Sequence, residues 1–255
     1  MDKQYKVGVV GATGMVGQRF VTLLENHPWF KLTTLAASGR SAGKTYEEAV
    51  GSRWAMTTPM PESVKKMVVL DASKVEEVAS QVDFIFCAVN MPKDEIKALE
   101  EAYAKAECPV VSNNSANRFT PDVPMVVPEI NADDIKWHHG LIANPNCATI
   151  IGLVPTWPLH QLAGVKRMIV STYQAASGAG APGMAELEAQ LAALGRGEEI
   201  PEPRAFAAQL ASNLIPQIGG VKEEGFTSEE MKLQNEGRKI CLLYTSPSPR
   251  DTERS

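Results

Sequence analysis

The sequence lacks the features typical of secreted, membrane and nucleic-acid-binding proteins. Its four cysteines include no CxxC pair, which argues against a disulfide framework and a metal site and fits reduced thiols in the cytoplasm. No apolar run is long enough to cross a bilayer, and no basic-then-apolar signal segment opens the chain. The net charge of −5 argues against nucleic acid as the main partner. We therefore expect a cytoplasmic protein that binds neither a membrane nor nucleic acid.

The first half of the chain alternates strand and helix patterns. The β-rich run 5–10 leads into a glycine turn, a helical pattern follows at 15–26, and a second strand is expected at 31–37. These segments form a βαβ unit. The remaining expected elements are strands at 67–70, 83–88, 109–112 and 141–143, and helices at 73–81 and 93–106. Short apolar strands that alternate with helices predict an α/β fold with a doubly wound Rossmann-type parallel sheet.

The pattern changes after Cys147, where we place a domain boundary. Alternating residues predict a strand at 166–174, and helices are expected at 184–194 and 228–239. The domains are thus 1–148, with the Rossmann-type sheet, and 149–240. From Cys241 the chain matches the translation of a sequencing-library adapter, so we expect 241–255 to be a non-native tail. The alternative is a natural Pro/Ser-rich tail that is disordered by composition.

The glycine turn and the loop after the second strand predict a dinucleotide site. Gly11, Gly14 and Gly17 let a turn tighten against a pyrophosphate, which a helix N-terminus would then hold. The loop 38–44 contains Ser38, Arg40, Ser41 and Lys44 but no carboxylate, which favours the 2′-phosphate of NADP over the ribose hydroxyls of NAD. The alternative is a solvated basic loop.

Cys147 is the candidate nucleophile. Pro145 and Asn146 suit a strand-to-helix turn, and Asn146 can cap a helix that starts near Cys147. A thiol at a helix N-terminus is expected to have a lowered pKa, and the same N–H groups can hold an oxyanion. The alternative is a buried structural cysteine.

Two further groups carry polar chemistry. The run 112–118 follows a strand and ends in Arg118, which is suited to a phosphate or carboxylate, although a capped turn with an exposed arginine is the simpler interpretation. Glu229 and Lys232 are spaced i, i+3 on a helix, and their default interpretation is a surface ion pair.

Several motifs in order resemble aspartate-semialdehyde dehydrogenase, especially its archaeal and fungal type, over residues 6–240. The resembling segments are 11–17 (GATGMVG), 38–43 (SGRSAG), 112–115 (SNNS), 127–131 (VPEIN), 144–149 (NPNCAT), 174–180 (QAASGAG) and 229–232 (EEMK).

The resemblance implies an NADP-dependent oxidoreductase of lysine, threonine and methionine biosynthesis. It implies that a thiolate attacks aspartyl-4-phosphate, phosphate leaves, and NADPH reduces the thioester to aspartate 4-semialdehyde, reversibly. Cys147 would be the nucleophile and Gln174 would orient the substrate. Arg118 would bind phosphate, and Glu229 and Lys232 would contact substrate or phosphate. The cofactor-binding residues would be Gly11, Thr13, Gly14, Met15, Val16, Ser38, Arg40, Ser41, Ser177 and Gly178. Domain 149–240 would bind substrate and form a homodimer or homotetramer.

The sequence departs from the family after Ile240. There the family has a substrate-binding arginine and an acid/base histidine that this sequence lacks, so we expect a truncated polypeptide with little or no activity. The alternatives are a malonyl-CoA reductase-like NADP-dependent enzyme and a non-catalytic NADP-binding fragment.

Overall fold

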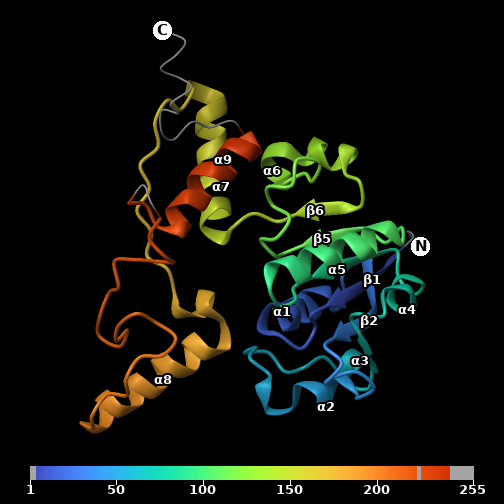
Figure 1. The fold of residues 1–255 in the computed structure, drawn as a ribbon, viewed down its shortest axis with the longest axis horizontal. Helices are drawn as coiled ribbons and strands as arrows, with labels where there is room; N and C mark the ends of the chain where they lie inside the picture. Colours follow the sequence, from blue (N-terminus) through green and yellow to red (C-terminus); the bar gives the residue numbers. More distant parts are fainter. Residues whose placement is uncertain (1–3, 223–224, 242–255) are drawn as a thin grey trace. The chain divides into compact units, whose positions relative to one another are not determined.

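A computed structural model describes residues 4–222 and 225–241, which divide into two compact units (Figure 1). The first unit comprises the residues up to Ala163 and the end of the last helix from Lys239, and the second comprises 164–238. The units divide at the end of the Cys147 helix, whereas the sequence-based boundary lies at its start. Apart from Cys241, the expected non-native tail lies outside the described residues.

The first unit is built on a six-stranded sheet with the order β3-β2-β1-β4-β5-β6. All neighbouring strands run parallel, which confirms the predicted doubly wound fold. Side chains of the central strands, such as Val7, Leu35 and Ile85, are fully buried because helices cover both faces. The strands are β1 (Tyr5–Val10), β2 (Phe30–Ala37), β3 (Val69–Asp71), β4 (Phe84–Cys87), β5 (Val110–Ser112) and β6 (Leu141–Ala143).

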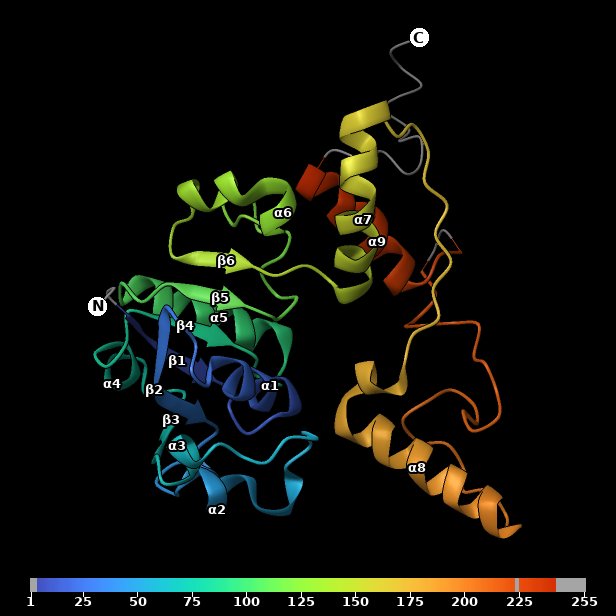
Figure 2. The same ribbon diagram turned by 180° about the vertical axis from the view of Figure 1, so that it is seen from behind.

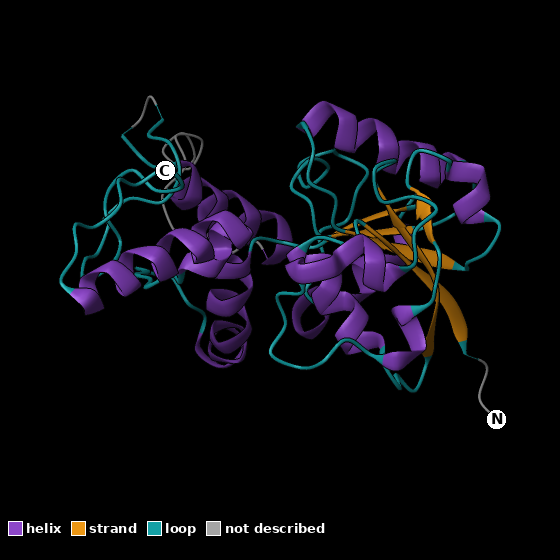
Figure 3. Ribbon diagram, turned by 90° about the horizontal axis from the view of Figure 1, so that it is seen from below, coloured by secondary structure: helices purple, strands orange, loops and turns teal. Residues whose placement is uncertain are grey.

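Helices of the first unit lie on both sides of the sheet, as Figure 3 shows from below. Helix α1 packs on β1 and β2, and α5 packs on β5 and β6. The helices of this unit are α1 (Met15–Leu24), α2 (Tyr46–Val50), η1 (Gly51–Arg53), α3 (Glu62–Lys65), α4 (Val75–Ala79), α5 (Lys93–Lys105), α6 (Pro128–Asn131), η2 (Ala132–Trp137) and α7 (Cys147–Ala163). The last turn of α9 (Ser228–Cys241) is grouped with them.

The glycine turn after β1 brings three backbone segments together. Gly11 has φ +91°, and a Cβ there would lie 2.4 Å from the Ala88 carbonyl oxygen, just after β4. A Cβ on Gly17 would lie 2.2 Å from the Gly11 oxygen. Side chains are therefore excluded at both positions. The turn lies between β1 and β4, where the strand order reverses and where open α/β sheets bind their ligands.

The second unit is organised around α8 (Gly180–Arg196), which follows the short η3 (Ala176–Ala179). Figure 2, seen from behind, shows the chain after α8 running back along the helix. Gln190 is fully buried and its Oε1 accepts hydrogen bonds from the N–H groups of Leu210 and Ala211, at 3.0 Å each. The Glu186 carboxylate accepts from the N–H groups of Arg204 and Ala205. Two side chains of α8 thus hold the following loop.

The prediction of a strand at 166–174 is wrong. The structure describes all of these residues, and none of them pairs with a neighbouring strand. An alternating pattern indicates two unlike faces, but a strand also needs a neighbour for its N–H and C=O groups. Ile169 and Tyr173 are 78% and 88% exposed, so neither buries its side chain. Within 4–222 and 225–241, no helix combines the length and apolar character needed to traverse a bilayer.

Candidate functional site

A cavity of about 1,020 Å³ opens at the carboxyl ends of the strands β1 to β4. Six of the ten predicted cofactor residues line it, namely Gly11, Thr13, Gly14, Ser38, Arg40 and Ser41. The sequence-based placement of a dinucleotide at the βαβ unit therefore coincides with a cavity large enough for a cofactor.

The N-terminus of α1 fits an anion. Gly14 is the N-cap and supplies no side chain to the first turn, which also contains no acidic residue. Met15 and Val16, two more predicted cofactor residues, are the first residues of this helix. Because the first N–H groups of a helix have no intrahelical acceptor, this turn presents donors and a positive dipole end at the cavity. A pyrophosphate suits that donor set.

Three cationic side chains line the neighbouring part of the cavity. Arg40 and Lys44 come from the loop predicted to hold the 2′-phosphate, and Ser41 in that loop is 7% exposed. Arg53, which the sequence analysis missed, joins them from η1 and donates from Nη2 to the Ala49 oxygen. This cluster fits a phosphomonoester better than a neutral ribose. Two carboxylates also line the cavity, Asp71 at the end of β3 and Glu95 in the first turn of α5.

Cys147 begins α7 and is exposed, as the nucleophile hypothesis requires. The side-chain oxygen of Asn146 accepts a hydrogen bond from the Ala148 N–H at 2.9 Å, which confirms the predicted cap. The turn follows β6, so Cys147 lies at the carboxyl edge of the sheet from which the cofactor cavity also opens.

Arg118 lies against the turn that leads to Cys147. Its Nε donates to the Asn144 carbonyl oxygen at 2.9 Å and its Nη2 to the Asn113 carbonyl oxygen at 3.3 Å. The Asn144 side-chain amide donates to Asn113 Oδ1 at 3.0 Å. Arg118 is 7% exposed, which contradicts the simpler interpretation of an exposed arginine. A guanidinium is thereby held beside the loop after β5 and the turn after β6.

Glu100 on α5 organises the loop 112–118, a role that the sequence analysis missed. Its side chain is fully buried. Oε1 accepts from Ser112 Oγ at 2.5 Å and Asn114 Nδ2 at 2.9 Å, and Oε2 accepts from Asn117 Nδ2 at 2.8 Å. The sequence did indicate that Glu100 is buried. It is spaced four residues after Ile96 and three before Tyr103, so all three share the buried face of α5.

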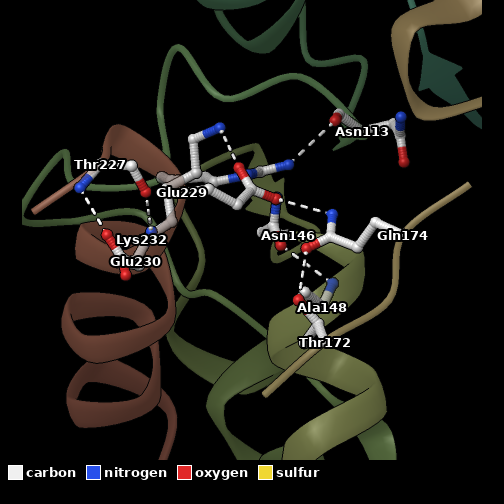
Figure 4. A network of polar contacts seen from close by, with 10 residues as sticks. Asn113, Asn146, Ala148, Thr172, Gln174, Thr227, Glu229, Glu230 and Lys232 are labelled. Atoms are coloured by element: carbon white, nitrogen blue, oxygen red, sulfur yellow. Dashed lines mark hydrogen bonds and ion pairs between the residues drawn. The ribbon is translucent and has the colours of Figure 1, made fainter. Parts of the chain in front are cut away.

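The second unit brings together three residues that were predicted to contact the substrate, Gln174, Glu229 and Lys232, and Figure 4 shows them in one network. Glu229, near the start of α9, pairs with Lys232 at 2.9 Å. The Gln174 amide nitrogen lies 3.4 Å from Glu229 Oε1, and the oxygen of this amide accepts from Thr172 Oγ1 at 3.0 Å. The carboxylate is therefore shared and not simply a partner in a surface pair. Ser177 and Gly178 lie in η3 of this unit.

Iodoacetamide is expected to label Cys147 before Cys87 and Cys108. Cys87 and Cys108 are buried, which raises the pKa of the Cys87 thiol, with the nearby Glu100 as a second cause, and raises the pKa of Cys108 to about 11. Neither offers an accessible thiolate at neutral pH. Mass spectrometry after reaction with a limiting amount of iodoacetamide measures the order in which the thiols are labelled, with Cys147→Ser as control. Preferential labelling of Cys87 or Cys108 would contradict the assignment.

Models of two protein families match the chain. The semialdehyde dehydrogenase NAD-binding domain matches residues 6–138, and the semialdehyde dehydrogenase dimerisation domain matches 157–249. The aspartate-semialdehyde dehydrogenase of Methanothermobacter thermautotrophicus is 37% identical, over 86% of this chain and 70% of that protein. The enzyme of the same name from Aquifex aeolicus is 40% identical, over 92% of this chain and 65% of that protein.

Solved structures agree with these matches. Aspartate-semialdehyde dehydrogenase II of Vibrio cholerae, complexed with ASA, has a TM-score of 0.81 at 35% identity, over 96% of this chain and 68% of that one. The Candida albicans enzyme, solved with NADP, has a TM-score of 0.71 at 31% identity, over 93% of this chain and 60% of that one. The chain thus spans roughly two thirds of the length of its relatives.

Proposed function

We propose that this chain, which belongs to the aspartate-semialdehyde dehydrogenase family, is an NADP-dependent oxidoreductase. Its proposed reaction interconverts aspartyl-4-phosphate and aspartate 4-semialdehyde. The observation that carries the proposal is an arrangement within the first unit. The cavity with its anion-binding helix end and the exposed Cys147 both lie at the carboxyl edge of one parallel sheet. A nucleophile and a cofactor site share the edge where open α/β sheets place their ligands.

Cys147 is the proposed nucleophile. Its thiolate attacks the acyl carbon of aspartyl phosphate, the first N–H groups of α7 hold the oxyanion, and inorganic phosphate leaves as the thioester forms. When bound, NADPH supplies the hydride that reduces this thioester. The tetrahedral thiohemiacetal anion that results would then break its C–S bond, which releases the semialdehyde and returns Cys147 as a thiolate.

Arg118 is the proposed phosphate-binding group beside this nucleophile. The carbonyl oxygens of Asn113 and Asn144 orient its guanidinium, so its position is set before substrate arrives. In the second unit, Gln174 is the proposed substrate-orienting residue, and Glu229 and Lys232 the proposed substrate or phosphate contacts. The family model for the C-terminal part is a dimerisation domain, and we propose that the protein is a homodimer or homotetramer in the cytoplasm.

The proposed activity predicts phosphate-dependent formation of NADPH from aspartate semialdehyde. The reaction is followed by NADPH absorbance in the 255-residue chain, and in a chimera whose segment after Ile240 comes from the Aquifex aeolicus relative, which supplies the third of the family length outside the match. We expect turnover in the chimera with NADP, and none when phosphate is omitted.

Two controls separate the alternatives. Malonyl-CoA with NADPH tests the related reductase activity, and NAD in place of NADP tests cofactor choice. Turnover of malonyl-CoA but not of the semialdehyde would contradict the proposed substrate. Equal rates with NAD and NADP would contradict the role of the basic cluster in the cavity.

A further inference from the structure

One part of the cofactor cavity, which we call the slot, is lined mainly by apolar side chains. One wall comes from the turn after β3 and the start of α4, with Ala72 and Val75. The other comes from α5, with Ala98, Leu99 and Ala102, and the carboxylate of Glu95 lies one turn earlier on the same helix. Apart from Glu95, these side chains carry no polar atoms. The slot therefore suits an apolar group, in contrast to the glycine turn and the basic cluster, which suit phosphates.

A buried tyrosine fixes the two walls relative to each other. Tyr103 on α5 is fully buried, and its hydroxyl donates to the Ala72 carbonyl oxygen at 2.8 Å. The turn after β3 is thus tied to α5. The slot is therefore a formed feature of the first unit before any ligand binds.

One carboxylate stands between the slot and the basic cluster. Asp71 ends β3, and its Oδ1 accepts from the N–H of Ser73 at 3.0 Å and from the Ser73 hydroxyl at 2.8 Å. These hydrogen bonds, the backbone one first, lower the pKa of Asp71, so the group is ionised at neutral pH. Its Oδ2 faces Gly39, where an added Cβ would lie 3.2 Å away. Gly39 directly precedes Arg40 in the basic cluster.

The order of these features matches the order of groups in an adenine dinucleotide phosphate. With the pyrophosphate at α1 and the 2′-phosphate at Arg40, the base attached to the same ribose lies beyond the basic cluster, at the slot. A purine has apolar faces for the slot walls. An ionised carboxylate only accepts hydrogen bonds and repels a phosphate. The donors at this end of the ligand are the ribose 3′-hydroxyl and the adenine 6-amino group, and because Asp71 directly precedes Ala72 of the slot we pair it with the base.

We propose that Asp71 accepts a hydrogen bond from the adenine 6-amino group and thereby makes the slot selective for adenine over 6-oxo purines. The inference rests on the proposed binding of NADP. It assigns a specificity-determining residue to the cofactor site that the glycine turn and the basic loop do not contain.

The test compares NADP with its deamino analogue, in which hypoxanthine replaces adenine. Dissociation constants are measured by calorimetry with the 255-residue chain, so no turnover is needed. We expect the deamino analogue to bind about 10- to 100-fold more weakly, as expected from the loss of a charge-assisted hydrogen bond and an oxygen placed against a carboxylate. In Asp71→Asn the difference should fall to about twofold or less, because an amide can donate to the hypoxanthine oxygen.

Arg40→Ala is the matched control. It should weaken both NADP and the deamino analogue by the same factor and leave their ratio unchanged, because it acts on the phosphate and not on the base. Circular dichroism checks that Asp71→Asn remains folded, and the comparison of the two ligands on the unsubstituted chain needs no variant at all.

Three results would overturn the inference. Equal affinity of the unsubstituted chain for the two ligands would show that the chain does not recognise the 6-amino group. A preference that persists unchanged in Asp71→Asn would show that Asp71 is not the residue that recognises it. If Asp71→Asn instead binds NADP more tightly while NAD is unaffected, the carboxylate faces the 2′-phosphate. Failure of the unsubstituted chain to bind NADP would overturn the cofactor proposal together with this one, whereas binding without base preference overturns this one alone.

Discussion

Replacing Cys147 with serine should abolish phosphate-dependent NADPH formation, with a loss of about 10³-fold or more, because a neutral hydroxyl is a far weaker nucleophile than a thiolate. Serine nearly matches the thiol in size, so the start of α7 and its Asn146 cap should be retained. NADP affinity should not change, since no residue of α7 lines the cofactor cavity. The two readouts are NADPH absorbance in the chimera and calorimetric titration with NADP.

Cys108→Ala is the matched control for this prediction. It also removes one thiol, but from a buried position outside the cavity, and should retain activity. Activity retained in Cys147→Ser would show that the reaction does not pass through this thiol. A parallel loss of NADP affinity would indicate that the substitution disturbs the sheet edge as a whole.

The strands of the parallel sheet and the helix that begins at Cys147 could be predicted because their signals are local. The buried parallel strands appear as short apolar runs, and all six lie within about two residues of their predicted bounds. The cap at Asn146 depends on contacts within the same turn. Such features need no knowledge of what packs against them.

The side chains that position the loops could not be predicted in the same way, because their partners are distant in sequence. Glu100 bonds to residues 12 to 17 positions later, and the Tyr103 hydroxyl reaches a carbonyl 31 positions earlier. Arg53 joins Arg40 only through the fold. The error at 166–174 has the same origin, since a strand is defined by a neighbour that its own pattern does not specify.

Glu100→Ala should lower the free energy of unfolding of the first unit by about 3 kcal/mol, because buried polar groups left without acceptors cost about 1–3 kcal/mol each. The groups concerned are the hydroxyl of Ser112 and the amides of Asn114 and Asn117, and Ser112 and Asn117 are buried. Urea unfolding followed by tryptophan fluorescence measures the change. All four tryptophans, at 29, 54, 137 and 157, lie in the first unit, so the signal reports that unit.

Glu101→Ala is the matched control for this prediction, because it makes the same chemical change at the next position of α5, where the side chain is only half-buried. It should change the free energy of unfolding by less than about 1 kcal/mol. Glu100→Ala should also raise the KM for phosphate in the chimera, since the loop that Glu100 holds ends at Arg118, whereas Glu101→Ala should leave it unchanged. Equal destabilisation by the two variants would show that the three hydrogen bonds contribute little. A large loss of stability without a change in the phosphate KM would separate the folding role of Glu100 from the placement of Arg118.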